Sequence, residues 1–500
     1  MLRRASPLLF LVGLAFVVTA ASPYFGRFMN ANERPRLLQG MAWVVSGSSA
    51  IDGPATGHIP AGIDVSRTTD GRLVPNKPPG TTVPAAAAFA LAKASGHDTL
   101  GAYTRLARAL GGWVPMLVVL VLARRRFPGP AGAFACVVLA LATPCLSYAR
   151  LLYGHVLAAA CLFGGVLALE QARRDSRVGL AALGGCIAGA AVSVEYLAAF
   201  AGIPIGVWLV WVARRTGAWS IAGAALAGAL VPIAGLMFYH QALFGSPWST
   251  PYHFVVREGF AEIHGQGLLG LSWPTGHSVF EHLLSPWGGL LYWAPLCVPA
   301  LWAMVQDVRR GDADGLERLS LANFGLLLAL NLCLVQTGGW RVGPRYLVLA
   351  FPFLLPGWVR VHEWLARRGL GAVVVALLGW SLLVNFFAAG LFPHLVPEGN
   401  PLRDLLLPLW AEGLRPYSIF GPWGLGLAGL GTLVLFVTIT RPRSAIERRQ
   451  WVVGLVGACL LFGAGLFVPG APAAEDTFAS VRSIWEPGGT RAPAVVELTP

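Results

Sequence analysis

The sequence predicts an all-α membrane protein, a polytopic transmembrane helical bundle with about 13 spans and a large first extracytoplasmic loop. Of its 500 residues, 55% are hydrophobic and only 12% are charged. A soluble chain of this composition would expose more apolar surface than one core can bury. Apolar runs close to the length of a bilayer span recur along the chain, and Arg, Gly or Pro clusters end each of them.

Short clusters of arginine predict the orientation, because Lys and Arg are retained on the cytoplasmic side in short loops. The clusters are Arg3-Arg4, Arg124–Arg126, Arg173-Arg174, Arg214-Arg215, Arg309-Arg310, Arg367-Arg368 and Arg441–Arg449. They fall on one side if each pair encloses two spans. We therefore expect a multi-pass protein of the bacterial cytoplasmic (inner) membrane, with its N-terminus inside and, because the number of spans is odd, its C-terminus outside.

The spans follow one another from the N-terminus almost to the end of the chain. They are predicted at Pro7–Ala21, Ala109–Ala123, Ala131–Ser147, Gly154–Gln171, Gly179–Tyr196, Ala198–Ala213, Trp219–Tyr239, Gly288–Gln306, Leu319–Val335, Tyr346–Trp364, Gly371–Gly390, Pro422–Thr440 and Trp451–Val468. The first also resembles a signal peptide, with Ala20-Ala21-Ser22 as a cleavage region. We expect it to be retained, since it places the following loop outside.

Residues 1–468 are predicted to form one transmembrane domain, followed by a mobile extracytoplasmic tail at 469–500. Its outer loops are 22–108, 240–287 and 392–421. In the first loop, apolar residues at helical spacing between Leu37 and Val45 predict a helix along the membrane surface, with Asn32 as N-cap. A second helix is predicted at Thr82–Lys93, and the Gly- and Pro-rich stretch Ser46–Pro79 is predicted to be an ordered loop.

Composition also excludes several classes of function. The formal charge of +13 is spread over short clusters between apolar runs rather than over one basic face, so no nucleic-acid partner is predicted. The seven cysteines lie in or beside apolar spans without a CxxC motif or zinc-ligand spacing. We therefore expect no disulfide framework and no metal site built on cysteine and histidine.

Four polar patches stand at the predicted outer ends of spans, where membrane proteins tolerate polarity mainly for function. They are Asn32–Arg36, Asn76–Gly80, Tyr153–His155 and Gly338–Tyr346. In the predicted topology all four lie on the same outer face.

These patches resemble those of the polyprenyl-phosphate-dependent glycosyltransferases of the GT-C fold, such as protein O-mannosyltransferases and lipid A aminoarabinose transferases. The resemblance rests on a carboxylate after the first span, a Lys-Pro-Pro motif closing the first loop, and Arg345-Tyr346-Leu347 with Pro352 and Pro356. It implies a membrane enzyme that moves a sugar, with inversion, from a polyprenyl-phosphate donor to an extracytoplasmic lipid, glycan or protein acceptor. Many relatives have an aspartate at the first-loop position, which reads Asn32-Glu33 here, so the resemblance implies that Glu33 acts as the carboxylate alone or together with Asp52, Asp64 or Asp70.

The resemblance assigns a role to each candidate residue. Glu33 is the expected catalytic base for the acceptor hydroxyl, and Lys77, Arg341 and Arg345 are the expected cations of the donor phosphate site. Candidates for the lining of the substrate cavity are His155, Glu195, Tyr196, Asp52, Asp64 and Asp70. No cofactor is predicted, and a contribution from a divalent metal is left open.

Each candidate also has a purely structural interpretation. Glu33 suits the first turn of a helix, Lys77 a solvated turn, and Arg345 an interfacial anchor. The outer aromatic residues Tyr239, His240, Trp248 and Tyr252 are typical of an interfacial belt. At the level of function, the alternatives are a transporter or flippase of lipid-linked sugars and an enzyme like the O-antigen ligases or membrane acyltransferases. Transporters usually place polar groups near mid-membrane, whereas here polarity gathers at the outer span ends.

Overall fold

The computed structural model describes residues 7–20, 30–53, 61–97, 99–259, 262, 270–334, 339–367, 369–395, 399–414, 418, 420–421, 423–470 and 472–484. Within these ranges the chain is helical apart from one small hairpin, as the sequence predicts. Residues 21 and 22 of the signal-like region and residues 485–500 of the predicted tail lie outside the described ranges.

The helices of the first half of the chain include most of the long apolar ones. They are α1 (Pro7–Ala20), α2 (Arg34–Ser46), η3 (Pro79–Thr81), α3 (Thr82–Ala94), α4 (Leu100–Arg108), η4 (Ala109–Trp113), α5 (Val114–Arg126), α6 (Gly129–Leu141), α7 (Cys145–Tyr148), α8 (His155–Asp175), α9 (Val178–Val194), α10 (Ala198–Thr216) and α11 (Trp219–Phe244).

The second half begins with shorter elements around the outer loops. They are η5 (Pro251–Phe254), α13 (Gly276–Leu283), α14 (Leu290–Trp293), α15 (Cys297–Arg310), α16 (Gly315–Leu332), η6 (Arg345–Leu354), α17 (Leu355–His362), η7 (Glu363–Ala366), α18 (Leu370–Leu391), η8 (Leu402–Leu406), α19 (Leu407–Ala411), α20 (Gly424–Thr440), α21 (Ala445–Phe467) and α22 (Ala474–Ile484).

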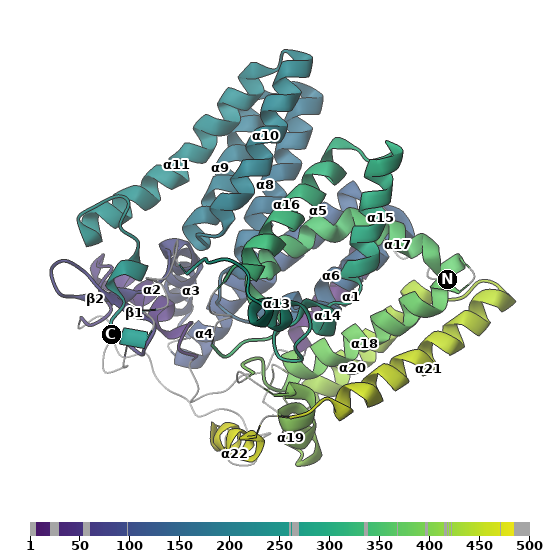
Figure 1. Cartoon of the computed structure of the whole chain (residues 1–500). Coiled ribbons are helices and arrows are strands. Elements are labelled where there is room, and N and C mark those ends of the chain that lie inside the picture. Colours follow the sequence, from purple (N-terminus) through teal and green to yellow (C-terminus); the bar gives the residue numbers. More distant parts are fainter. Residues whose placement is uncertain are drawn as a thin grey trace.

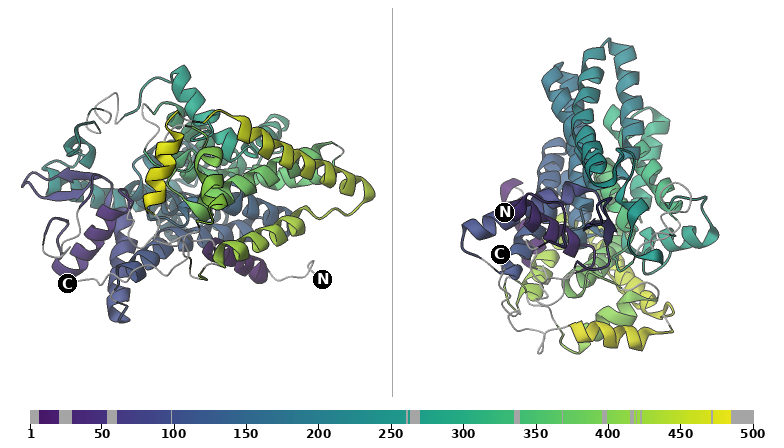
Figure 2. Two further views of the ribbon diagram at one scale, coloured as in Figure 1. Left: turned by 90° about the horizontal axis from the view of Figure 1, so that it is seen from below. Right: turned by 90° about the vertical axis from the view of Figure 1, so that its left-hand side faces the viewer.

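The long helices form two groups with the small outer elements between their ends. Helices α8 to α11 stand together at the top of Figure 1, and α18, α20 and α21 run side by side at its lower right. Figure 2 shows α8 to α11 extending away from the rest of the molecule. The first outer loop, with α2, α3, α4 and the hairpin, packs at the lower ends of α8 to α11 in Figure 1. The main apolar core runs through α6, α7, α8, η6, α17 and α18.

Apolar side chains cover the outside of the peripheral helices, which suits a lipid environment. Helices α10 and α11 expose Val207, Trp211, Leu230 and Phe238, and α20 and α21 expose further Leu and Val side chains. A water-soluble protein rarely presents apolar surface so continuously. Six helices among the described residues are long and apolar enough to cross a membrane, and four shorter apolar helices accompany them.

Four predicted spans differ in the structure from straight α-helices. The span predicted at Ala109–Ala123 begins as the π-helix η4, and the span predicted at Ala131–Ser147 is interrupted between α6 and α7, where Pro144 stands. The span predicted at Gly288–Gln306 is interrupted between α14 and α15, where Pro295 removes a backbone donor. The span predicted at Tyr346–Trp364 begins as the ten-residue 3-10 helix η6 with Pro352 inside it, and continues as α17. Proline cannot complete the α-helical hydrogen-bond ladder, so hydropathy located these segments without showing their breaks. The count of 13 spans stays a prediction.

The first outer loop contains the two predicted helices and a pair of short strands that the sequence did not predict. Helix α3 agrees closely with the prediction at Thr82–Lys93, and α2 covers the predicted amphipathic segment. The N-cap of α2 is Glu33, and the prediction of Asn32 was wrong by one residue. Inside the predicted loop, β1 (Val65–Arg67) pairs antiparallel with β2 (Leu73–Pro75). The strands are three residues long, too short for the alternation of apolar and polar residues to be detected.

Part of the predicted tail is helical. Helix α22 packs against η8, and Arg482 forms an ion pair with Glu412 at 3.1 Å. The first turn of α22 carries Glu475 and Asp476, which favour a helix start through the helix dipole. The mobility of the tail stays a prediction.

Candidate active site

The polar residues of the first outer loop meet the ends of the long helices that lie away from the arginine clusters. Helix α8 begins at His155 and ends near Arg174, and the continuous helix formed by α4, η4 and α5 passes from Arg108, at the end of α4, to Arg126. Helix α9 runs the opposite way and ends beside Glu195. The arginine ends carry their own ion pairs, such as Arg126 with Glu170 at 3.4 Å. The candidate site therefore lies at the face that the topology predicts to be outer.

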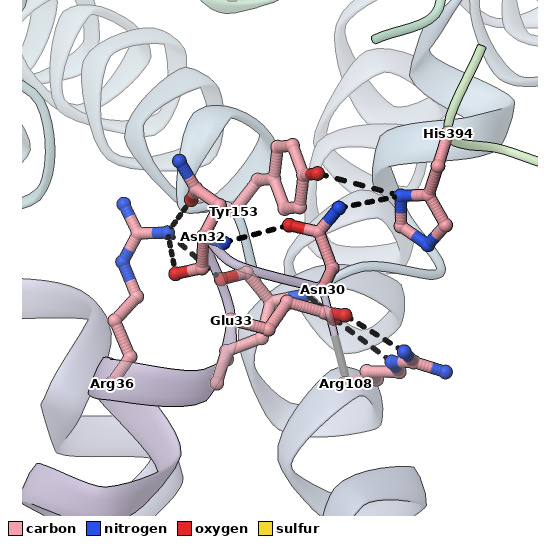
Figure 3. A network of polar contacts seen from close by, with 8 residues as sticks. Asn30, Asn32, Glu33, Arg36, Arg108, Tyr153 and His394 are labelled. Carbon is pink, nitrogen blue, oxygen red and sulfur yellow. Dashed lines mark hydrogen bonds and ion pairs between the residues drawn. The ribbon is translucent and has the colours of Figure 1, made fainter. Parts of the chain in front are cut away.

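Glu33 is held on both carboxylate oxygens (Figure 3). The guanidinium of Arg108 donates to Oε1 at 2.9 Å and to Oε2 at 2.7 Å, and the backbone N–H of Leu152 donates to Oε1 at 2.8 Å. Only 1% of Glu33 is exposed. The pair joins the start of α2 to the end of α4, so Glu33 fixes the position of the first loop against the bundle.

The contacts of Glu33 also determine its protonation. Burial alone would raise the pKa of Glu33, but the charge and hydrogen bonds of Arg108, with the Leu152 amide, hold it below its ordinary value. A carboxylate that is so well satisfied is a weak base. Its predicted catalytic role stays a prediction, and the contacts favour a positioning role.

This pairing makes stability sensitive to acid. Because the folded-state pKa of Glu33 is depressed, its contribution is present above the ordinary pKa of 4.5 and is lost as the pH falls through the folded-state pKa. We expect the midpoint temperature of thermal unfolding of the purified protein to decrease when the pH is lowered below about 4.5. The decrease should be less steep in Glu33→Gln. Thermal unfolding in detergent across pH 3 to 7 measures both profiles. Parallel profiles would contradict the assignment.

A second group of hydrogen bonds links three outer segments beside Glu33 (Figure 3). The side-chain amide of Asn30 donates to His394 Nδ1 at 3.1 Å, and the Tyr153 hydroxyl lies 3.4 Å from the same nitrogen. Burial lowers the pKa of His394 to about 3, so the ring is neutral and Nδ1 accepts. Asn30 Oδ1 in turn accepts from the Asn32 backbone at 2.7 Å. These hydrogen bonds link the third outer loop, which contains His394, to the first outer loop, which contains Asn30.

Lys77 occupies the next position along the face. Its ammonium lies over the ring of Tyr252, 5.2 Å from the centroid, and the side chain is half-buried. Among the described residues it forms no ion pair with a carboxylate, although Asp64, Arg345 and Arg36 all act on it electrostatically. Burial lowers the pKa of Lys77 against the opposing effect of Asp64. A desolvated cation without a salt bridge is well placed to bind an anion.

Asp64 is the carboxylate beside Lys77. It is buried at the start of the hairpin, and its backbone carbonyl accepts from Asn76, the residue before Lys77, at 3.1 Å. Within the described ranges, the one hydrogen bond to its carboxylate comes from the Asn32 amide at 3.4 Å, a long contact. Asp64 therefore keeps acceptor capacity, unlike Glu33.

The other two aspartates of the loop lie away from this cluster. Asp52 accepts from the backbone of Leu73 at 3.0 Å and so supports the hairpin from outside. Asp70 is exposed in the hairpin turn, where it pairs with Arg72 at 2.6 Å and accepts from Thr68. Their contacts stabilise the loop and give no support to a role in the site.

Two arginines face the same space as Lys77. Arg36 donates through Nη1 to the backbone and side-chain oxygens of Asn32, and it acts electrostatically on Glu195 and Asp64. Arg345 lies over the ring of Tyr346, 4.6 Å from the centroid, and donates to its hydroxyl at 2.6 Å. Its Nε has no hydrogen-bond partner among the described residues.

His155 and Glu195 lie together across the cluster. His155 Nδ1 is 3.2 Å from Glu195 Oε1, and both side chains are buried. Gly154, with φ of 90°, precedes His155 in a conformation that a side chain would strain, and an added Cβ would come within 2.6 Å of Thr81 Oγ1. The glycine thus lets α8 start against η3. Tyr196, next to Glu195, contacts His240 at 2.8 Å.

Arg341 lies further along the same segment as Arg345. Its guanidinium is stacked over Trp287 at 4.0 Å, and 1% of the residue is exposed. None of its three guanidinium nitrogens has a hydrogen-bond partner among the described residues. Arg345 and Arg341 repel each other electrostatically, so their proximity is costly in the absence of an anion.

Sequence reasoning missed several residues around these candidates. Arg108 gave one signal, a basic residue on the face predicted to be outer, contrary to the usual charge bias. His394 is a lone histidine in the third outer loop, and Tyr252 was interpreted as part of an aromatic belt. Their contacts with Glu33 and Lys77 join segments that are far apart in sequence, which single-chain patterns do not reveal.

Solved structures of membrane glycosyltransferases are similar to this chain. ArnT from Cupriavidus metallidurans in the apo state is 17% identical, with a TM-score of 0.49, over 90% of this chain and 77% of ArnT. The archaeal oligosaccharyltransferase AglB from Archaeoglobus fulgidus, in complex with an inhibitory peptide and a dolichol-phosphate, is 12% identical, with a TM-score of 0.44, over 99% of this chain and 61% of AglB. Arabinosyltransferase EmbB from Mycobacterium smegmatis is 14% identical, with a TM-score of 0.45, over 97% of this chain and 42% of EmbB.

The chain spans less than two thirds of AglB and of EmbB. With TM-scores below 0.5, these likenesses carry no weight in assigning donor or acceptor, which rests on the geometry of the site. No protein-family model matches the chain, and no curated protein matches it. Among the described residues, no group of three or more His, Cys, Asp or Glu side chains is arranged to hold a metal ion.

Proposed function

We propose that this protein is a membrane glycosyltransferase that moves a sugar from a polyprenyl-phosphate donor to the hydroxyl of an extracytoplasmic acceptor. One observation carries the proposal. Lys77, which has no carboxylate ion pair among the described residues, interacts electrostatically both with the buried carboxylate Asp64 and with a second cation, Arg345, at one end of the bundle. This transfer requires cations that stabilise the leaving phosphate and, beside them, a base that accepts the proton of the attacking hydroxyl.

The donor phosphate is bound by Lys77 and Arg345. In a lipid-linked sugar the phosphate is a diester with one negative charge, and it gains charge as the bond to the sugar carbon breaks. Fixed cations that are already desolvated stabilise that developing charge more strongly than water does. Lys77 lies over the ring of Tyr252 and Arg345 lies over the ring of Tyr346, and these cation–π contacts stabilise the positions of the two cations. Arg341, on the same segment, is the third predicted cation.

Asp64 is the base that the contacts favour. The acceptor hydroxyl attacks the sugar carbon from the face opposite the phosphate, its proton passes to the carboxylate, and the lipid phosphate leaves with the bonding electrons. The configuration at the sugar carbon is inverted. Asp64 has a free acceptor position for that proton, whereas both oxygens of Glu33 are occupied by Arg108 and the Leu152 amide. Glu33, the base expected from the motif, then positions the loop.

His155 and Glu195 line the remaining side of the cluster. His155 Nδ1 lies 3.2 Å from Glu195 Oε1, and Glu195 interacts electrostatically with Arg36 and Lys77. A buried carboxylate and imidazole next to the donor phosphate are suited to binding sugar hydroxyls, which both donate and accept hydrogen bonds. We assign them to sugar recognition.

Replacement of Lys77 by alanine tests the donor site. Loss of a charge-assisted hydrogen bond to phosphate should weaken binding of a polyprenyl phosphate by about tenfold or more. The measurement is titration of the lipid into purified protein in nanodiscs, with transfer from the lipid-linked sugar assayed in parallel. Lys93, exposed on α3, is the only other lysine of the chain, and Lys93→Ala is the matched control.

Two outcomes would contradict the proposal. Lipid binding that is unchanged in Lys77→Ala would remove Lys77 from the donor site. Movement of a lipid-linked sugar across the bilayer by the parent protein, without formation of a new glycosidic bond in the presence of an acceptor extract, would favour a flippase instead.

A further inference from the structure

Arg341 is a buried charge to which the described residues offer no hydrogen-bond acceptor. A buried guanidinium loses its hydration, and the loss is normally offset by hydrogen bonds or an ion pair. Within the described residues Arg341 has neither: its nitrogens Nε, Nη1 and Nη2 are all buried and unpartnered. Burial, together with repulsion from Arg345, lowers the pKa of Arg341 to about 9, so it remains charged at neutral pH. A buried guanidinium without a partner is therefore expected to bind an anion.

The surroundings of Arg341 hold it in place. The ring of Trp287 supports the guanidinium plane from one side at 4.0 Å. At Gly288 an added Cβ would lie 2.2 Å from Nη2, so the glycine makes room for the head group. The Tyr148 hydroxyl accepts from the backbone N–H of Val342 and donates to its carbonyl, both at 3.1 Å, which fixes the segment. The guanidinium of Arg341 is therefore held in a fixed position before any anion binds.

Other groups around Arg341 leave its donors available. The indole Nε1 of Trp287 is also buried without a partner among the described residues. Glu281 attracts Arg341 electrostatically, and its Oε2 is also buried without a hydrogen-bond partner among the described residues. His282, which also interacts electrostatically with Arg341, has its Nδ1 3.0 Å from the side-chain amide of Asn331. Arg341 and Trp287 thus present buried N–H donors, and Arg341 lies on the same segment as Arg345.

We propose that Arg341 and Trp287 form a second anion subsite, which binds a phosphate group in addition to the one bound by Lys77 and Arg345. This inference rests on the proposed function, because it places the subsite next to the donor phosphate. Phosphate presents several acceptor oxygens and negative charge, which match the fork of a guanidinium and the indole N–H. The substrates together would then carry two phosphate groups.

The second phosphate has two chemical sources. It is either the outer phosphate of a polyprenyl diphosphate donor or a phosphate carried by the acceptor. The test compares a polyprenyl monophosphate with a polyprenyl diphosphate, both titrated into the full-length protein in nanodiscs. In a second arm, inorganic phosphate is titrated into protein without lipid and into protein already saturated with the monophosphate. Both arms are run on the parent, Arg341→Gln and the control Arg72→Gln, which alters an exposed arginine of the hairpin.

Two results support the subsite and distinguish the sources. In one result, the parent binds the diphosphate about tenfold tighter than the monophosphate, whereas Arg341→Gln binds the two lipids with equal affinity. The second phosphate then belongs to the donor. If the two lipids bind alike but the lipid-saturated parent takes up inorganic phosphate and Arg341→Gln does not, it belongs to the acceptor. Trp287→Phe, which keeps an aromatic ring and removes the N–H, should weaken binding of the second phosphate. It serves as the second variant if Arg341→Gln fails to fold.

Other results would overturn one inference without the other. Equal binding of both lipids, with no uptake of phosphate by the saturated parent, would refute the subsite while the Lys77 site and the proposed function stand. Absence of any polyprenyl-phosphate binding by the parent, with uptake of inorganic phosphate that depends on Arg341, would refute the proposed function and retain the anion subsite.

Discussion

Asp64→Asn should lower the rate of sugar transfer by about two to four orders of magnitude, the usual cost of losing a general base. The amide keeps the shape of the side chain but accepts no proton from the acceptor hydroxyl. Lipid binding should change little, since Lys77 and Arg345 remain. The assay is turnover of the lipid-linked sugar in nanodiscs with an acceptor extract, alongside titration of the polyprenyl phosphate.

The hairpin supplies a matched control for this substitution. Asp70→Asn alters an exposed carboxylate six residues away that pairs with Arg72, and it should transfer sugar at the parental rate. If Asp64→Asn also retained the parental rate while its thermal midpoint matched the parent, the base would lie elsewhere. Glu33, as the motif predicts, and Glu195 would then be the remaining buried carboxylates of the cluster.

Glu33→Gln should destabilise the fold by about 3–5 kcal/mol, because it leaves the buried charge of Arg108 without its carboxylate. The side chain of Glu33 is 1% exposed and that of Arg108 10% exposed, so solvent screens the pair weakly. Thermal unfolding in detergent, with the parent and Lys93→Ala as references, measures the loss. Activity should fall with the folded fraction.

A double substitution separates positioning from catalysis. Glu33→Gln combined with Arg108→Gln removes both charges and should regain much of the lost stability, since a neutral pair costs less to bury than one unpaired charge. If Glu33 positions the loop, transfer should recover together with folding. A stable double variant without transfer would instead identify Glu33 as the base.

Several features of the fold follow from local patterns that the sequence carries in full. Apolar runs of span length predicted α8, α10, α11, α18 and α21, because a helix in lipid must be apolar all round. Four arginine clusters end helices α5, α8, α10 and α15, as the predicted topology requires. The polar patches predicted that Lys77, Arg345 and His155 lie on the same outer face, and Glu195 was predicted at an outer span end.

The site shows what such patterns leave undetermined. Glu33 and Asp64 are both carboxylates of the same outer loop, and nothing in their neighbouring residues distinguishes a base from a structural anchor. Their difference comes from Arg108 and the Leu152 amide, which reach Glu33 from the ends of other helices. Whether a carboxylate is saturated or available depends on the three-dimensional arrangement of donors, and sequence spacing carries no information on it.

The sequence by itself determined the membrane class, the approximate position of the long helices and the face on which the polar patches were predicted to lie, because these depend on composition and period along one chain. Only the tertiary structure decided the saturation of Glu33, the acceptor capacity left on Asp64 and the burial of Arg341 without a partner among the described residues. These properties arise from contacts between segments that are separate in the sequence, such as Leu152 with Glu33 and Trp287 with Arg341. Long-range packing sets the local dielectric and the number of hydrogen-bond partners, and these two quantities determine what a charged side chain can do.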